Sequence, residues 1–182
     1  MFVFDPQSYG PELAPLLAGA PVNELGPGKP NASMRAALTA VCSNDREISA
    51  ACCAGLWLRH DFLDQSHSIS QSLQTPEGSY WHAIMHRREP DFANSKYWFR
   101  RVGTHAIFGP LNAAAQKLSR EAKLGREAAA LAEQTEWDPM RFVDLCEIAL
   151  DGPSPIGTLC MSIQLCEWEL LFDHCFRQAR GS

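Results

Sequence analysis

The chain has 182 residues, 46% of them hydrophobic and 20% charged, a balance typical of a folded domain and not of a disordered segment. Its formal net charge of -5 argues against a nucleic-acid binder, because such proteins need a dominant basic surface. Seven cysteines without C-x-x-C spacing, no signal-peptide pattern and no long apolar stretch predict reduced thiols, a cytoplasmic location and no membrane contact.

A proline-rich segment opens the chain. Six prolines within residues 1–32 leave room only for short helical pieces between turns, so we expect an irregular, extended arm that lies on the domain. Helix formers then predict one long helix that runs through residues 48–73, with Asp45 as its N-cap and Gly55 as the point where it can bend. This is the longest helical signal in the chain.

Two shorter helices are expected next. A turn over residues 74–79 leads into a helix over 80–89, which Pro90 ends. So short a connection predicts that this helix and the preceding one are antiparallel neighbours. Asp91 is placed to cap a third helix over residues 92–102.

The second half of the chain is rich in alanine, leucine and charged helix formers. We expect helices over 111–134, 139–150 and 155–177, the last two each begun by a capping residue followed by proline. No period-2 alternation supports a sheet. The prediction is an all-α, irregular multi-helix bundle in one domain, residues 1–182, made of an arm (1–32), helices that carry the functional residues (45–105) and C-terminal helices (111–178).

Polar residues recur at helical spacing on both sides of the 74–79 turn. On the helix before it they are His60, Asp64, His67 and Gln71, at i, i+4, i+7 and i+11. On the helix after it they are His82, His86 and Glu89, at i, i+4 and i+7. Each set shares one helix face, and apolar residues flank both faces. If the helices are antiparallel, the two sets converge on a pocket between them.

This pattern suits a divalent transition metal, with His60, Asp64, His67, His82 and His86 as its ligands. Neutral imidazoles and carboxylates bind zinc, iron, nickel or manganese, and helix bundles build such sites from facing helices. An open coordination position would turn a bound water into a nucleophile, with Glu89 or Asp61 as the catalytic base or as a partner of a ligand. Hydrolase or lyase chemistry would follow.

Two other interpretations of the same residues remain open. A polar stripe opposite an apolar face is the ordinary pattern of an amphipathic helix, and histidines are tolerated on solvated faces. The histidines can also form a metal-free cluster that is hydrogen-bonded to carboxylates. The H-E-x-x-H metalloprotease motif is absent, since Ala83 follows His82.

Cations and aromatic residues accompany the histidines. We expect a small anionic molecule to be bound by Arg87, Arg88, Lys96, Trp98 and Arg100. Arginine forks match carboxylate or phosphate oxygens, and an aromatic ring stacks on a planar ligand. In the alternative, the residues Tyr97 to Phe99 belong to the core, while the arginines pair with Glu89, Asp91 and Glu77.

The stretch from Leu56 to His105 contains the motifs HDFLD-x-SH, GSYWHAIMHRRE and NSKYWFRRVG. It resembles a family of uncharacterised proteins from environmental bacteria that carries no assigned activity. The resemblance therefore implies signature positions but no catalytic roles. These positions are His60, Asp61, Asp64, His67, His82, His86, Arg87, Arg88, Glu89, Asn94, Lys96, Trp98 and Arg100. Gln65 departs from the acidic residue expected in the family.

The sequence thus favours a metal-dependent enzyme that acts on a small anionic substrate. One alternative is a non-enzymatic module that binds an anionic metabolite in a metal-free pocket of histidines and arginines. The other is a structural protein that forms a homodimer through its C-terminal helix, residues 155–177, which is apolar around much of its circumference.

Overall fold

The computed structural model describes residues 2–43, 48–122, 124–150 and 154–181. Within these ranges the chain forms ten packed α-helices and no strand, so the predicted all-α class is confirmed. They are α1 (Ala14–Ala18), α2 (Arg35–Cys42), α3 (Ala50–Arg59), α4 (Leu63–Ser70), α5 (Pro76–Arg88), α6 (Phe92–Val102), α7 (Phe108–Ala122), α8 (Arg126–Glu133), α9 (Pro139–Ala149) and α10 (Pro155–Ala179).

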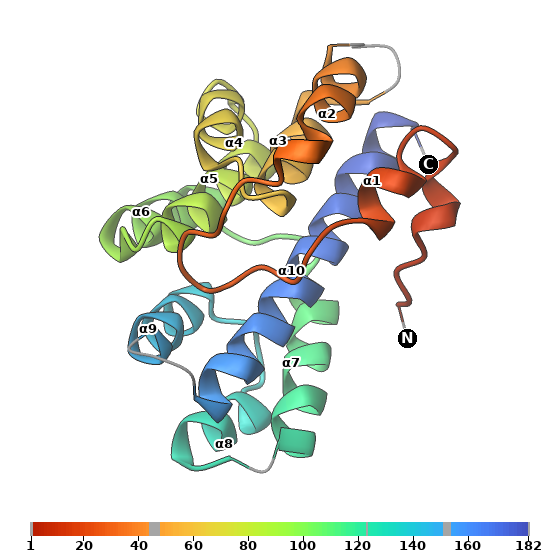
Figure 1. Ribbon diagram of the computed structural model, residues 1–182. Coiled ribbons are helices and arrows are strands. Elements are labelled where there is room, and N and C mark those ends of the chain that lie inside the picture. Colours follow the sequence, from red (N-terminus) through yellow and green to blue (C-terminus); the bar gives the residue numbers. More distant parts are fainter. Residues whose placement is uncertain (1, 44–47, 123, 151–153, 182) are drawn as a thin grey trace.

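The C-terminal helix α10 is the central element of the fold. It runs through the molecule and packs against α3, α7 and α9 (Figure 1). As predicted, Ser154 caps its first turn by accepting a hydrogen bond from the Gly157 amide at 3.0 Å. Its apolar side chains, among them Ile163 and Leu171, are buried against these neighbours. Burial against other helices of the same chain therefore explains why α10 is apolar on most of its sides.

The prediction of one long helix through residues 48–73 is wrong, because the chain forms two helices there, α3 and α4. Asp61 lies between the two helices with φ at +63°, a left-handed conformation that ends an α-helix. The helical spacing from His60 to Gln71 consequently does not describe one face. Asp45, the expected cap, lies outside the described residues; Ser49 caps α3 instead by accepting from the Cys52 amide.

Gly55 marks a close approach between helices and not a bend. It lies inside α3, where the Trp81 indole of α5 packs against it, and a Cβ at this position would lie only 2.7 Å from Cζ2 of Trp81. The Gly55 carbonyl also accepts a hydrogen bond from Nε1 of Trp168 at 2.9 Å. Glycine is needed here because any side chain would separate α3 from α5.

Other helix boundaries follow local capping. α5 begins earlier than expected, at Pro76, because Thr75 accepts a hydrogen bond from the Gly78 amide. The helix expected over 111–134 is divided into α7 and α8, and Gly125 stands at the start of α8. α6 and α9 confirm the prediction, with Asp91 and Asp138 as their caps.

The proline-rich arm is irregular, as predicted, and polar contacts fasten it to the helices. It contains α1 and two short 3-10 helices, η1 (Pro6–Tyr9) and η2 (Ala32–Met34). Nδ2 of Asn23 donates to the Arg59 carbonyl at 3.0 Å and to the Asp61 carboxylate at 2.9 Å. The arm therefore docks at the point where α3 ends.

Candidate metal centre

Three histidines from two adjacent helices meet in one cluster. His67 lies on α4, His82 and His86 lie one turn apart on α5, and the two helices pack against each other. Each histidine offers one ring nitrogen, and these nitrogens all lie within 4.8 Å of one another. The predicted convergence of polar residues across the 74–79 turn therefore holds for these three.

The cluster lies at the edge of the core and not deep within it. His82 and His86 are 2% and 6% exposed, whereas His67 is half-buried and closes the cluster on the solvent side. The His67 ring meets the rings of His82 and His86 edge-on, with centroids 4.7 and 5.3 Å away. Trp98 of α6 stacks on His82 at 4.0 Å and fixes the plane of that ring.

Hydrogen bonds on both sides of His86 define its tautomer. Its Nδ1 lies 3.2 Å from the Glu89 carboxylate, an acceptor that places the ring proton on Nδ1. Its Nε2 is then an acceptor, and it lies 2.8 Å from Nε2 of His82 and 3.1 Å from Nδ2 of Asn94. The metal-free cluster is thus a chain in which His82 donates to His86 and His86 donates to Glu89.

Burial favours the neutral form of His82 and His86. Together with smaller contributions from the neighbouring His86 and His67, burial lowers the pKa of His82 to about 3. Burial also lowers the pKa of His86, against the opposing influence of Glu89, which favours the charged form. Neutral imidazole is the form that binds metal, so burial favours the ligand form of both groups.

The donor set fits a zinc-class ion after a small rearrangement of the rings and a shift of one proton. Two nitrogens on a tetrahedral zinc, each about 2.0 Å from it, lie roughly 3.3 Å apart. The facing nitrogens of His82 and His86 are 2.8 Å apart, so the rings must separate by about half an ångström, and the His82 proton must move to Nδ1. Nδ1 of His82 has no hydrogen-bond partner among the described residues, so no existing bond opposes that shift.

His60 and Asp64, the other two expected ligands, do not join this cluster. His60 is fully buried at the end of α3, where Nε2 lies 2.9 Å from the Leu16 carbonyl and Nδ1 lies 3.3 Å from Asn31. It therefore binds the N-terminal arm. Asp64 lies in the first turn of α4 and is exposed. The break at Asp61 separates His60 from the helix that carries His67, whereas Asp64 shares α4 with His67 but is exposed.

The two acidic residues expected to act as catalytic bases have other partners. Asp61 is 8% exposed and pairs with Arg88 at 2.5 Å while accepting from Asn23. Its carboxylate is occupied in fastening the arm. Glu89 is adjacent to the cluster, where its carboxylate accepts a hydrogen bond from Nδ1 of His86 and so orients that ring. Carboxylates often hold metal-binding histidines in this way.

Arg87 and Arg88 are buried and do not form an anion site beside the histidines. Arg87 is fully buried, pairs with Glu167 of α10 at 2.5 Å and lies over the Phe142 ring at 4.7 Å. Arg88 donates to the Gly26 carbonyl at 3.1 Å as well as to Asp61. Both arginines pair with carboxylates, as the alternative expects, but their partners are Glu167 and Asp61 and not the carboxylates close to them in sequence.

The remaining expected ligand-binding residues have three different environments. Lys96 pairs with Asp144 of α9. Trp98 stacks on His82, so its ring supports the cluster. Arg100 is exposed at the end of α6, where it lines a cavity that does not contain the histidine cluster.

Sequence reasoning missed a second cluster of Glu77, His105 and His174. Their ligand atoms also lie within 4.8 Å of one another, and Oε1 of Glu77 lies 3.4 Å from Nε2 of His174 and 3.9 Å from Nε2 of His105. The three residues come from α5, the α6–α7 connection and α10. No sequence spacing connects them, so only the tertiary fold reveals the cluster.

The tautomer of His105 distinguishes this second cluster from the first. Nδ1 of His105 accepts a hydrogen bond from the Ile107 amide at 3.3 Å, which places the proton of the neutral ring on Nε2, the nitrogen directed to Glu77. A metal would need that nitrogen unprotonated. Gln178 also donates to Glu77, at 3.3 Å. The arrangement is that of a carboxylate surrounded by donors.

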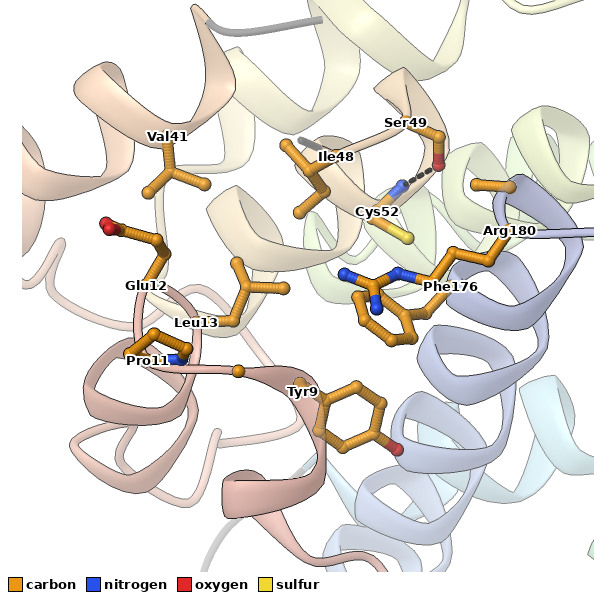
Figure 2. Close-up of a pocket in the computed structure, with 12 residues that line it drawn as sticks. Tyr9, Pro11, Glu12, Leu13, Val41, Ile48, Ser49, Cys52, Phe176 and Arg180 are labelled. Carbon is orange, nitrogen blue, oxygen red and sulfur yellow. Dashed lines mark hydrogen bonds between the residues drawn. The ribbon is translucent and has the colours of Figure 1, made fainter. Parts of the chain in front are cut away.

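A separate hollow of about 690 Å³ lies between η1, α3 and the end of α10 (Figure 2). Its walls are largely apolar and include Tyr9, Leu13 and Ile48, while the Arg180 guanidinium lies over the Phe176 ring at 4.2 Å. This hollow contains no residue of either histidine cluster. It resembles a surface groove and offers no metal ligand set.

No protein-family model, curated protein or solved structure matches this chain. The resemblance through the HDFLD-x-SH, GSYWHAIMHRRE and NSKYWFRRVG motifs therefore stays a prediction. Among the described residues no helix is both long and apolar enough to cross a membrane. The roles of the residues consequently rest on the geometry of this chain.

Proposed function

We propose that the protein binds a divalent transition-metal ion, with zinc as the best fit, through His67, His82 and His86, and that the ion serves a hydrolase or lyase reaction. The observation that carries this proposal is the convergence of three imidazole nitrogens from two helices within 4.8 Å. Three neutral nitrogen ligands leave one position of a tetrahedral ion for water, as in catalytic zinc sites. Such an ion lowers the pKa of the bound water towards neutral.

Glu89 and Trp98 support the proposal because they hold rings and not the ion. A carboxylate on the far nitrogen of a metal-binding histidine fixes its tautomer and raises its basicity, and Glu89 stands in that relation to His86. Stacking by Trp98 restricts His82. Nδ2 of Asn94 lies 3.1 Å from Nε2 of His86, the nitrogen that would bind the ion. A half-turn of the Asn94 amide would direct its Oδ1 to the ion instead.

Metal titration with a matched variant tests the proposal. Chelator-treated protein is titrated with zinc by calorimetry, and with cobalt by absorption spectroscopy, since tetrahedral cobalt gives a distinctive spectrum. His67→Ala removes one ligand from a half-buried position, and Ser68→Ala alters the exposed neighbour on α4 as a control. We expect His67→Ala to weaken zinc binding by at least about tenfold and the control to leave it unchanged.

Equal zinc affinity in the His67→Ala variant and the wild type, with both folded, would overturn the metal site. The catalytic part has its own test, the hydrolysis of small carboxylate and phosphate esters by zinc-loaded protein, with His67→Ala as the blank. Zinc binding without turnover on any of these esters would identify the ion as a structural link between α4 and α5.

A metal-free polar cluster is the second candidate, favoured by one observation. The 2.8 Å separation of the His82 and His86 nitrogens is a normal hydrogen-bond length, and the chain from His82 through His86 to Glu89 is complete without an ion. It predicts no zinc binding beyond that of scattered surface histidines. The same titration therefore decides between the two candidates.

A further inference from the structure

A cavity of about 890 Å³ lies between the end of α6, the start of α7 and the segment that joins α8 to α9. Its lining combines aromatic side chains with buried polar ones. The aromatic members are Phe99, Phe108 and Trp137. The buried polar members are His105, Asn112 and Gln134. This composition, an aromatic wall with a few polar groups, is that of a small-molecule site.

Four buried polar atoms in this lining have no hydrogen-bond partner among the described residues. They are Nε2 of His105, Oδ1 of Asn112, Nε2 of Gln134 and Nε1 of Trp137. Asn112 and Gln134 are only 7% and 9% exposed, and the side chain of His105 is 3% exposed. Leaving such groups unsatisfied is costly, and native proteins keep few of them without a reason. Their concentration around one cavity points to a partner that enters it.

The chemistry of these atoms indicates what that partner offers. Gln134 presents an amide N–H and Trp137 an indole N–H. The Nε2–H of His105 is directed to the Glu77 carboxylate, 3.9 Å away, and is not counted as a ligand contact. Asn112 presents a carbonyl oxygen, since its Nδ2 already donates to the Thr135 carbonyl at 3.1 Å. The ligand must therefore accept at two points and donate at one.

An exposed cation and a helix N-terminus favour an anion at one side of the cavity, although three carboxylates line it against two arginines. Arg100 lines it, is exposed, and has no hydrogen bond or ion pair among the described residues. The first turn of α7, a 15-residue helix, also borders the cavity, and the N-terminal end of a helix favours negative charge. Arg141 is already paired with Asp138 at 3.5 Å. Glu133 and Glu136 are exposed members of the lining, where solvent screens their repulsion.

We propose that this cavity binds a small hydroxylated oxyanion, a hydroxycarboxylate or a phosphate monoester. Arg100 pairs with the anionic group, Gln134 and Trp137 donate to its oxygens, and Asn112 accepts from a hydroxyl. Binding requires the buried amides to turn towards the ligand, since their free atoms have almost no exposed surface in the empty cavity. The site is separate from the metal centre and does not depend on metal binding.

Ligand titration of chelator-treated, metal-free protein tests the proposal. The probes are glycerate, malate, glycerol 3-phosphate and inorganic phosphate, each tested up to about 10 mM by calorimetry and ligand-observed NMR. The first two represent carboxylates and the last two phosphates, so the panel also assigns the anionic group. We expect at least one organic probe to bind more tightly than inorganic phosphate, because its alcohol hydroxyl lies apart from the anionic group and can reach Asn112 while that group pairs with Arg100.

Two matched pairs of proteins complete the test. Arg100→Gln should weaken binding by at least about tenfold, while Arg101→Gln, one residue along α6 and over the Trp98 ring at 5.2 Å, should leave it within about twofold. Gln134→Met should abolish binding without lowering Tm, since it removes a donor that the free protein leaves unpaired. Failure of every probe to bind, or equal losses from Arg100→Gln and Arg101→Gln, would identify the cavity as a water-filled hollow and overturn the proposal.

Discussion

The Glu89 carboxylate lies 3.2 Å from Nδ1 of His86, while Nε2 of the same ring lies 2.8 Å from Nε2 of His82. One imidazole thus joins a carboxylate at the protein edge to a buried histidine. The orientation of the His86 ring depends on Glu89, whether the facing nitrogens share a proton or an ion. Glu89 is therefore a positioning residue.

Replacing Glu89 by Gln tests this dependence. The amide oxygen still accepts a hydrogen bond from the ring but cannot stabilise positive charge on it, and the amide can turn its NH2 group to the ring instead. We expect zinc affinity to fall by on the order of 10- to 100-fold. Competition with a chromophoric chelator measures the change. Asp64→Asn, an exposed carboxylate on the neighbouring helix, should leave affinity unchanged. Equal effects of both variants would show that Glu89 acts only through net charge.

The buried pair of Arg87 and Glu167 predicts a strong and asymmetric stability effect. Both side chains are fully buried, and Tyr80 donates to the same carboxylate at 3.1 Å. Glu167→Gln leaves a buried guanidinium uncompensated, so we expect the free energy of unfolding to fall by about 3–5 kcal/mol. The double variant Arg87→Met, Glu167→Leu should recover most of the loss. Urea denaturation measures both, and a double variant no better than the single one would contradict this explanation.

His105 predicts how stability changes with pH. Burial lowers its pKa to about 4, with His174 adding to the effect and Glu77 opposing it. Between pH 6.5 and 4 the unfolded chain binds a proton that the folded protein does not, so the free energy of unfolding falls as the pH falls. From pH 6.5 to 5 the loss from this residue reaches at most about 2 kcal/mol.

The difference in the free energy of unfolding between the wild type and His105→Gln, measured at several pH values, separates the contribution of His105 from that of the other buried histidines. Denaturation curves at pH 7, 6 and 5 should show a shallower loss of stability in the variant. Glu77, whose pKa is lowered by its hydrogen bonds in spite of burial, adds stability that is lost only below about pH 4.5, outside this window. Parallel losses in the two proteins would show that His105 takes up its proton normally in the folded state.

Asp61 predicts the stability of the N-terminal arm. Asp61→Ala removes the partner of Arg88 and Asn23 and also places alanine at a φ of +63°. We expect a cost of about 3–5 kcal/mol and faster proteolysis within the arm. Asp61→Asn keeps a side chain that tolerates this conformation, so it should cost less. Limited proteolysis followed by mass spectrometry locates the cleavage, and protection of the arm in Asp61→Ala would contradict this role.

Helix positions were predictable where local chemistry decides them. Asp91, Asp138 and Ser154 cap the helices that the sequence assigns to them, because a capping side chain needs only the next three residues. The break at Asp61 was not predictable in this way. No proline or glycine marks it, and contacts with the arm some 38 residues earlier hold the left-handed backbone in place.

The candidate site was predictable to the extent that helix periodicity controls it. His82 and His86 lie one turn apart, and the short turn before α5 brings His67 to them. The partners of Arg87 and Arg88 were beyond prediction. Glu167 lies 80 residues from Arg87 along the chain, and Asp61 is the residue at the unpredicted break between α3 and α4. Periodicity identifies a shared face, but only tertiary packing decides whether that face meets solvent, an ion or a counter-charge.

The reversal at Asp61 links two parts of the molecule that sequence analysis treated as independent. One carboxylate both fastens the arm and sets the direction in which α4 leaves α3, and α4 carries His67. Loosening of the arm should therefore disturb the position of His67. If the proposed metal site is correct, metal affinity will report whether the arm is docked. Proteolytic removal of the arm should then lower metal affinity before it lowers helix content.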